Sequence, residues 1–73
     1  MDLDLHATDR VDIVREAVVR IASVAGDDET AHGYEDELHV AVLRAIAAGA
    51  PDAAALATEA LRTRDLDFAR WCA

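Results

Sequence analysis

Two histidines and an aspartate on one predicted helix are the side chains in this sequence best suited to binding a metal ion. His32, Asp36 and His39 stand at positions i, i+4 and i+7, so a regular helix places them on one face. Imidazole nitrogens and carboxylate oxygens bind zinc and similar divalent ions. A fixed site also needs groups from other elements, and the sequence predicts none. We favour an exposed polar face in which His39 pairs weakly with Glu35, and expect no cofactor.

Nucleophilic catalysis finds little support among the remaining side chains. The single serine, Ser23, lies inside a predicted helix and not on the strained turn that exposes a catalytic serine. The single cysteine, Cys72, has no histidine near it in the sequence to activate its thiol. The three glycines are scattered and form no phosphate-binding loop. We therefore expect a protein that is not an enzyme.

Acidic residues dominate the charge of the chain. There are 15 Asp and Glu against 7 arginines and no lysine, which gives a formal net charge of −8. Nucleic-acid backbones and anionic membranes bind basic surfaces, so direct binding to either is not expected. Six of the carboxylates lie close together in the sequence and form a predicted acidic belt: Asp27, Asp28, Glu29, Glu35, Asp36 and Glu37.

A compact acidic surface fits a basic groove on a partner protein. The sequence therefore favours a protein-binding module that regulates or inhibits its partner, for instance a phage or mobile-element protein that occupies a nucleic-acid-binding surface. The alternative use of the belt, solubility, is the commoner one. Arg70 and Trp71 add a second candidate contact, because Arg and Trp are enriched at interface hot spots. Alternatively, Phe68 and Trp71 close the core.

The spacing of apolar residues predicts an all-α fold. Three main helices are expected, at about residues 9–25, 30–48 and 51–63. Gly26 and Gly49 supply the left-handed stops that end the first two. Connections of a few residues favour antiparallel neighbours, so the helices should form a small bundle.

A short fourth helix, residues 66–72, is expected to close one end of this bundle. Residues 1–8 show no helical period and are expected to form a flexible arm before a single domain of residues 9–73. One cysteine allows no intrachain disulfide, and no apolar run approaches the roughly 20 residues that span a bilayer. The acidic first residues lack the pattern of a signal peptide. We expect a soluble, cytoplasmic protein.

The predicted inward faces differ in width. The first helix has the widest apolar stripe, consisting of Val11, Ile13, Val14, Ala17, Val18, Ile21, Val24 and Ala25. The second helix turns inward Tyr34, Leu38, Ala41, Val42, Ala45 and Ile46, and the third turns inward Leu56, Ala57, Ala60 and Leu61. The wide first stripe either contacts both other helices or forms a homodimer seam, which a chain this small can need. A self-associating structural protein is therefore an alternative function.

Overall fold

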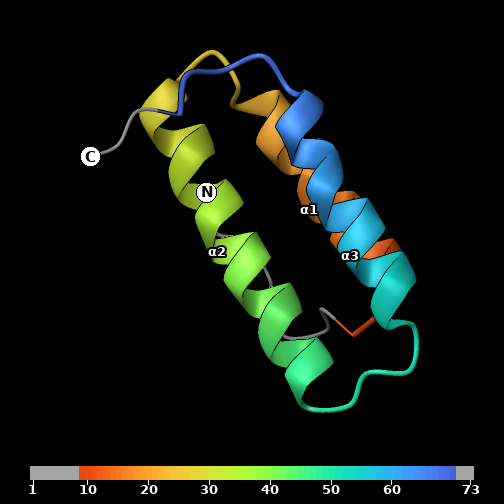
Figure 1. The fold of residues 1–73 in the computed structure, drawn as a ribbon. Coiled ribbons are helices and arrows are strands. Elements are labelled where there is room, and N and C mark those ends of the chain that lie inside the picture. Colours follow the sequence, from red (N-terminus) through yellow and green to blue (C-terminus); the bar gives the residue numbers. More distant parts are fainter. Residues whose placement is uncertain (1–8, 71–73) are drawn as a thin grey trace.

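The computed structural model describes residues 9–70, which form a bundle of three α-helices (Figure 1). Helix α1 spans Val11–Ser23, α2 spans Asp28–Ala47 and α3 spans Ala53–Leu61. A 3-10 turn, η1, continues α3 over Arg62–Asp65. Each helix packs against the other two. The predicted all-α bundle of three main helices is confirmed; the predicted arm, residues 1–8, lies outside the described residues.

The ends of the helices follow the local sequence with one exception. Asp27 caps α2, because its Oδ1 accepts a hydrogen bond from the backbone N–H of Thr30 at 3.2 Å. Gly49 has φ of 96°, a left-handed conformation that ends α2 as predicted. The prediction for Gly26 was wrong, since its φ is not positive. Instead α1 ends at Ser23, and the amide of Val24 bonds to the carbonyl of Ile21 in a tighter turn.

The predicted fourth helix is wrong over the part that the structure describes. Residues 66–70, here called the strap, are not helical, and the backbone of Leu66 is extended with φ of −77° and ψ of 143°. The Arg70 guanidinium donates hydrogen bonds to the carbonyls of Thr63 and Leu66. In a continuing α-helix, these carbonyls would accept from backbone amides four residues later. The strap instead runs back to the N-terminal half of α2 (Figure 1). Residues 71–73 lie outside the described residues.

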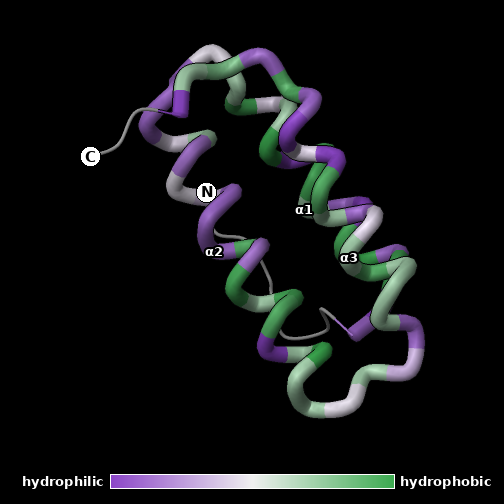
Figure 2. Tube along the Cα trace, in the orientation of Figure 1, coloured by the Kyte–Doolittle hydropathy of each residue, from purple (hydrophilic) through white to green (hydrophobic). Residues whose placement is uncertain are grey.

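The core lies between the three helices and is closed at one end by the strap. Its buried apolar residues are Val14, Ala17, Ile21, Ala31, Leu38, Val42, Leu56, Ala60 and Phe68. Phe68 is therefore a core residue. Figure 2 shows the apolar stretches along each helix and the mainly hydrophilic first half of α2. Within the described residues, no helix is both long and apolar enough to cross a membrane.

Most of the predicted inward faces are confirmed, with one apolar residue wrongly placed inside and three polar residues buried in addition. The wide stripe of α1 is used within the chain, because α1 packs against α2, α3 and η1. Leu61 was wrongly predicted to point inward, since it is 60% exposed. Three polar residues are buried in addition to the apolar core: Glu35, Glu59 and Thr63. Glu59 faces the Arg15 and Arg62 guanidinium groups at 3.3 and 3.4 Å.

Candidate functional site

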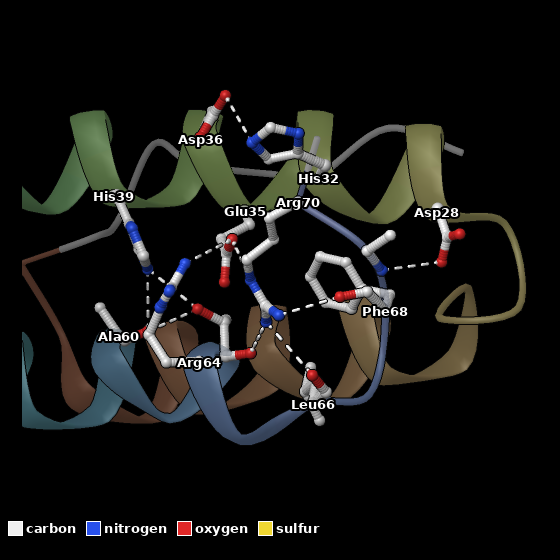
Figure 3. Close-up of polar contacts among 12 residues, drawn as sticks. Asp28, His32, Glu35, Asp36, His39, Ala60, Arg64, Leu66, Phe68 and Arg70 are labelled. Atoms are coloured by element: carbon white, nitrogen blue, oxygen red, sulfur yellow. Dashed lines mark hydrogen bonds and ion pairs between the residues drawn. The ribbon is translucent and has the colours of Figure 1, made fainter. Parts of the chain in front are cut away.

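The first half of α2 buries a carboxylate. Glu35 follows Ala31 by four residues and precedes Leu38 by three, so the helical period turns its side chain toward the core. It is 2% exposed. A buried carboxylate needs a cation and hydrogen bonds to remain charged. The Arg70 Nε donates to Glu35 Oε1 at 2.8 Å, and Arg64 Nη1 lies 3.8 Å from the same oxygen (Figure 3).

Arg70 joins the strap to both α2 and η1. Besides Glu35, its guanidinium donates to the carbonyls of Thr63, Leu66 and Phe68. Its Cζ lies 3.9 Å from the centre of the Phe68 ring, which is the geometry of a cation–π contact. The Arg70 side chain is only 17% exposed. Arg70 therefore lies inside the fold. Arg70 and Glu35, which were both predicted to contact a partner, instead form an ion pair with each other. Trp71, the other predicted contact at this end, lies outside the described residues.

His39 forms a second polar link, between α2 and the end of α3. Its Nε2 lies 3.1 Å from the Ala60 carbonyl oxygen and 2.9 Å from the Thr63 hydroxyl oxygen. The Thr63 hydroxyl also donates to the Ala60 carbonyl at 3.1 Å. A carbonyl oxygen only accepts hydrogen bonds, so a bond to Ala60 requires the tautomer with the proton on Nε2, whereas the Thr63 hydroxyl can pair with either tautomer. Thr63 thus joins both polar links, through its carbonyl to Arg70 and through its hydroxyl to His39.

The charge state of Glu35 follows from these neighbours. Burial raises the pKa of its carboxyl group, but the hydrogen bond and charge of Arg70, together with the nearby Thr63 hydroxyl and His39 side chain, outweigh it, so the pKa lies below the ordinary value of 4.5. Glu35 is therefore ionised at neutral pH. Its second oxygen, Oε2, is buried and accepts no hydrogen bond.

The three predicted metal ligands do not form one site. His32 Nε2 lies 3.5 Å from Asp36 Oδ2 on the solvent side of α2. Figure 3 shows His39 pointing away from that pair, toward Ala60. Across residues 9–70, no group of three or more His, Cys, Asp or Glu side chains is placed to hold a metal ion.

Without Glu35, the predicted belt becomes a smaller surface. The other five carboxylates are exposed and are here called the acidic face: Asp27, Asp28, Glu29, Asp36 and Glu37. Asp27 is the helix cap, and hydrogen bonds from the backbone and hydroxyl of Thr30 lower its pKa. Asp28 Oδ1 accepts a hydrogen bond from the amide of Ala69 at 3.0 Å, so the strap touches this face.

The excess of negative charge is concentrated on α2. In α1, two acids are matched by two arginines, and the same holds for α3 with η1. In contrast, the single arginine of α2, Arg44, lies in its last turn, away from the acidic face. Arg15 and Arg62 pair with Glu59, and Arg64 lies near Glu35. Arg10, which precedes α1, pairs with Asp12.

Two apolar side chains extend the solvent side of α2 beyond the carboxylates. Val40 and Leu43 are 46% and 65% exposed. Val40 follows Asp36 by four residues and Leu43 follows it by seven, so all three share one side of the helix. This exposed pair was not predicted, although both residues fall outside the inward stripe of α2.

Comparisons with known proteins identify no relative. No family model matches the chain, and neither the curated proteins nor the solved structures include a significant match.

Proposed function

We propose that this chain is a small, non-enzymatic protein-binding module whose acidic face occupies a basic surface on a partner protein and so regulates or inhibits it. The observation that carries the proposal is the uneven charge. The acids of α1 and of α3 with η1 are balanced by arginines, whereas the acidic face of α2 is not. A concentrated charge of one sign steers a partner of opposite charge and speeds association at low salt.

Two exposed apolar residues beside the acidic face add apolar contact area to its charge. Val40 and Leu43 offer exposed apolar area on the same side of α2 as Asp36. Protein interfaces commonly combine a central apolar patch with a polar rim. Acids at one end and apolar side chains at the other suit a partner surface in which basic residues adjoin an apolar patch.

A protein surface that binds DNA or RNA phosphates has the required positive charge. An inhibitor that occupies such a surface competes with the nucleic acid. Inhibitors encoded by phages or other mobile elements could use this chemistry. The helical backbone of α2 holds the carboxylates in a fixed arrangement, which lowers the entropy lost on binding.

The test is capture of the partner from a lysate of the source organism. The protein is tagged at its N-terminus, because the strap lies near the other end, and bound proteins are eluted with rising salt. The proposal predicts a stoichiometric protein with a basic, nucleic-acid-binding surface, released at moderate salt. Recovery of the bait alone, or only of proteins whose retention does not depend on salt, would count against it.

Self-association is the second candidate function. It is supported by the exposed Val19 on α1 and by Val40 and Leu43 on α2. We rank it below the first because a symmetric contact through α2 brings two acidic faces together, and like charges oppose that contact. Sedimentation at high micromolar concentration decides the question: a single species with the mass of one chain would remove this candidate.

A further inference from the structure

We propose that Glu35 and the carbonyl of Thr63 form a binding site for a guanidinium group. Arg70 fills this site in the structure, and an arginine side chain of a partner fills it when the strap lifts. The site goes beyond the acidic face, since it is buried under the strap. Only the source of the second arginine, a partner protein, rests on the proposed function.

The first reason is that Arg70 donates a hydrogen bond to only one of the two oxygens of the Glu35 carboxylate. A guanidinium can donate two parallel hydrogen bonds to the two oxygens of one carboxylate. Arg70 donates only Nε to Glu35 Oε1, because its other two nitrogens donate to the carbonyls of Phe68, Thr63 and Leu66. Glu35 Oε2 is left buried without a partner. A guanidinium not tied to the strap carbonyls can reach both oxygens.

The second reason is that the strap has only two polar anchors to α2 among the described residues. The strap is not helical, and its polar anchors to α2 are the Arg70–Glu35 pair and the exposed bond from the Ala69 amide to Asp28. Arg64 Nη1 stays 3.8 Å from Glu35 Oε1 from its position on η1. Glu35 therefore keeps one cation nearby while Arg70 is exchanged.

The strap also indicates the chemistry of a competing ligand. Its guanidinium is stacked on an aromatic ring two residues earlier in the chain, and the segment between them is not helical. A planar guanidinium fits the two carboxylate oxygens and the adjacent carbonyl, whereas a lysine ammonium does not match this fork. The ligand we infer is a non-helical segment that carries an arginine with an aromatic residue two positions before it.

The test is chemical rescue of the full chain carrying Arg70→Ala. Ethylguanidinium at millimolar concentration should refill the site and raise the Tm by roughly 4 °C once its concentration exceeds the Kd several-fold. Ethylammonium at the same concentration should not. Arg64→Ala is the matched control, since it removes a guanidinium near the same oxygen and leaves the site filled. The double variant Glu35→Gln/Arg70→Ala should show no rescue. Equal effects of the two compounds, or rescue in the double variant, would overturn the proposal.

A second arm uses the unaltered protein, so the test does not depend on the folding of a variant. The peptide acetyl-Phe-Ala-Arg-amide is added while NMR follows hydrogen exchange at Arg70 Nε and at the amide of Ala69. Competition with a tethered strap requires millimolar peptide or more. We expect both protons to exchange at least twofold faster with this peptide and not with its lysine analogue. Rescue by ethylguanidinium without displacement by the peptide would overturn the partner-arginine part, and the rescue itself does not depend on the acidic face.

Discussion

Arg70 Nε lies 2.8 Å from Glu35 Oε1, which joins the last residue that the structure describes to a buried carboxylate 35 positions earlier in the chain. The contact closes the bundle. It holds the strap against α2 while Phe68, from the same segment, enters the core. The Glu35–Arg70 pair therefore helps to define the architecture alongside the apolar stripes of the helices.

Removing the guanidinium of Arg70 should destabilise the fold strongly. Arg70→Ala leaves the buried Glu35 charge without its closest partner, and loss of one member of a buried ion pair costs about 3 kcal/mol or more. Arg64→Ala is the matched control. The Arg64 side chain is 59% exposed and lies farther from the same oxygen, so its loss should cost less than about 1 kcal/mol. Urea unfolding measures both values, and equal losses would show that the pair is not the main anchor.

Stability should fall in acid, and Glu35 should account for part of the loss. The folded-state pKa of Glu35 is depressed below 4.5, so its contribution is complete above that pH and is lost as the pH falls through the lower folded-state value. Asp27 acts in the same direction, because its pKa is also lowered. Relief of repulsion within the net negative charge acts in the opposite direction.

The comparison of the parent chain with Glu35→Gln isolates the term due to Glu35. Unfolding free energies are measured by urea titration from pH 3 to pH 7. The difference between the two proteins should be constant at neutral pH and shrink below pH 4.5, because the glutamine does not titrate. A difference that stays the same across the whole range would contradict the assignment of Glu35 as an ionised, stabilised carboxylate.

Two leucines on α3 should respond differently to the same substitution. Leu56 is fully buried, so Leu56→Ala should cost about 2–5 kcal/mol. Leu61 is 60% exposed, and Leu61→Ala should change stability by no more than about 0.5 kcal/mol. Thermal and urea unfolding provide the comparison. A large loss for Leu61→Ala would mean that α3 is rotated relative to the bundle described above.

The cap of α2 gives a fourth prediction. Asp27→Ala removes the acceptor for the Thr30 amide and should lower the Tm by roughly 3–5 °C. Asp27→Asn keeps an acceptor oxygen at the same position and should retain most of the stability. If the two variants melt at the same temperature, the side chain of Asp27 does not act as a cap.

The three main helices could be predicted because the helical period alone sets the spacing of their apolar residues. Val14, Leu38 and Leu56 each stand in a stripe that a single sequence reveals. Glu35 was misplaced because it belongs to a run of acids, and such runs usually face solvent. Its position in the stripe with Leu38 and Val42 was the signal for burial.

The strap could not be predicted from local sequence. Asp65 is a suitable cap for a short helix at residues 66–72, and that local signal favoured one. The structure of residues 66–70 depends instead on a distant carboxylate, Glu35, and on hydrogen bonds from the Arg70 guanidinium to the carbonyls of Thr63 and Leu66. Tertiary contacts of this kind override local propensity. The five residues of the acidic face were all predicted to lie on an acidic surface, and the error was to include Glu35. The excess of negative charge on α2 relative to the other helices became clear only from the helix boundaries.

A matched pair of charge reversals tests the proposed function most directly. Asp36→Lys/Glu37→Lys alters the acidic face, and Asp12→Lys/Glu16→Lys makes the same change in net charge at exposed positions of α1. Capture from the lysate is repeated with both variants and quantified by mass spectrometry. The account predicts that the α2 variant loses the salt-sensitive partner by about tenfold or more while the α1 variant retains it. Equal retention by both variants, or equal loss from both, would contradict a binding role for the acidic face.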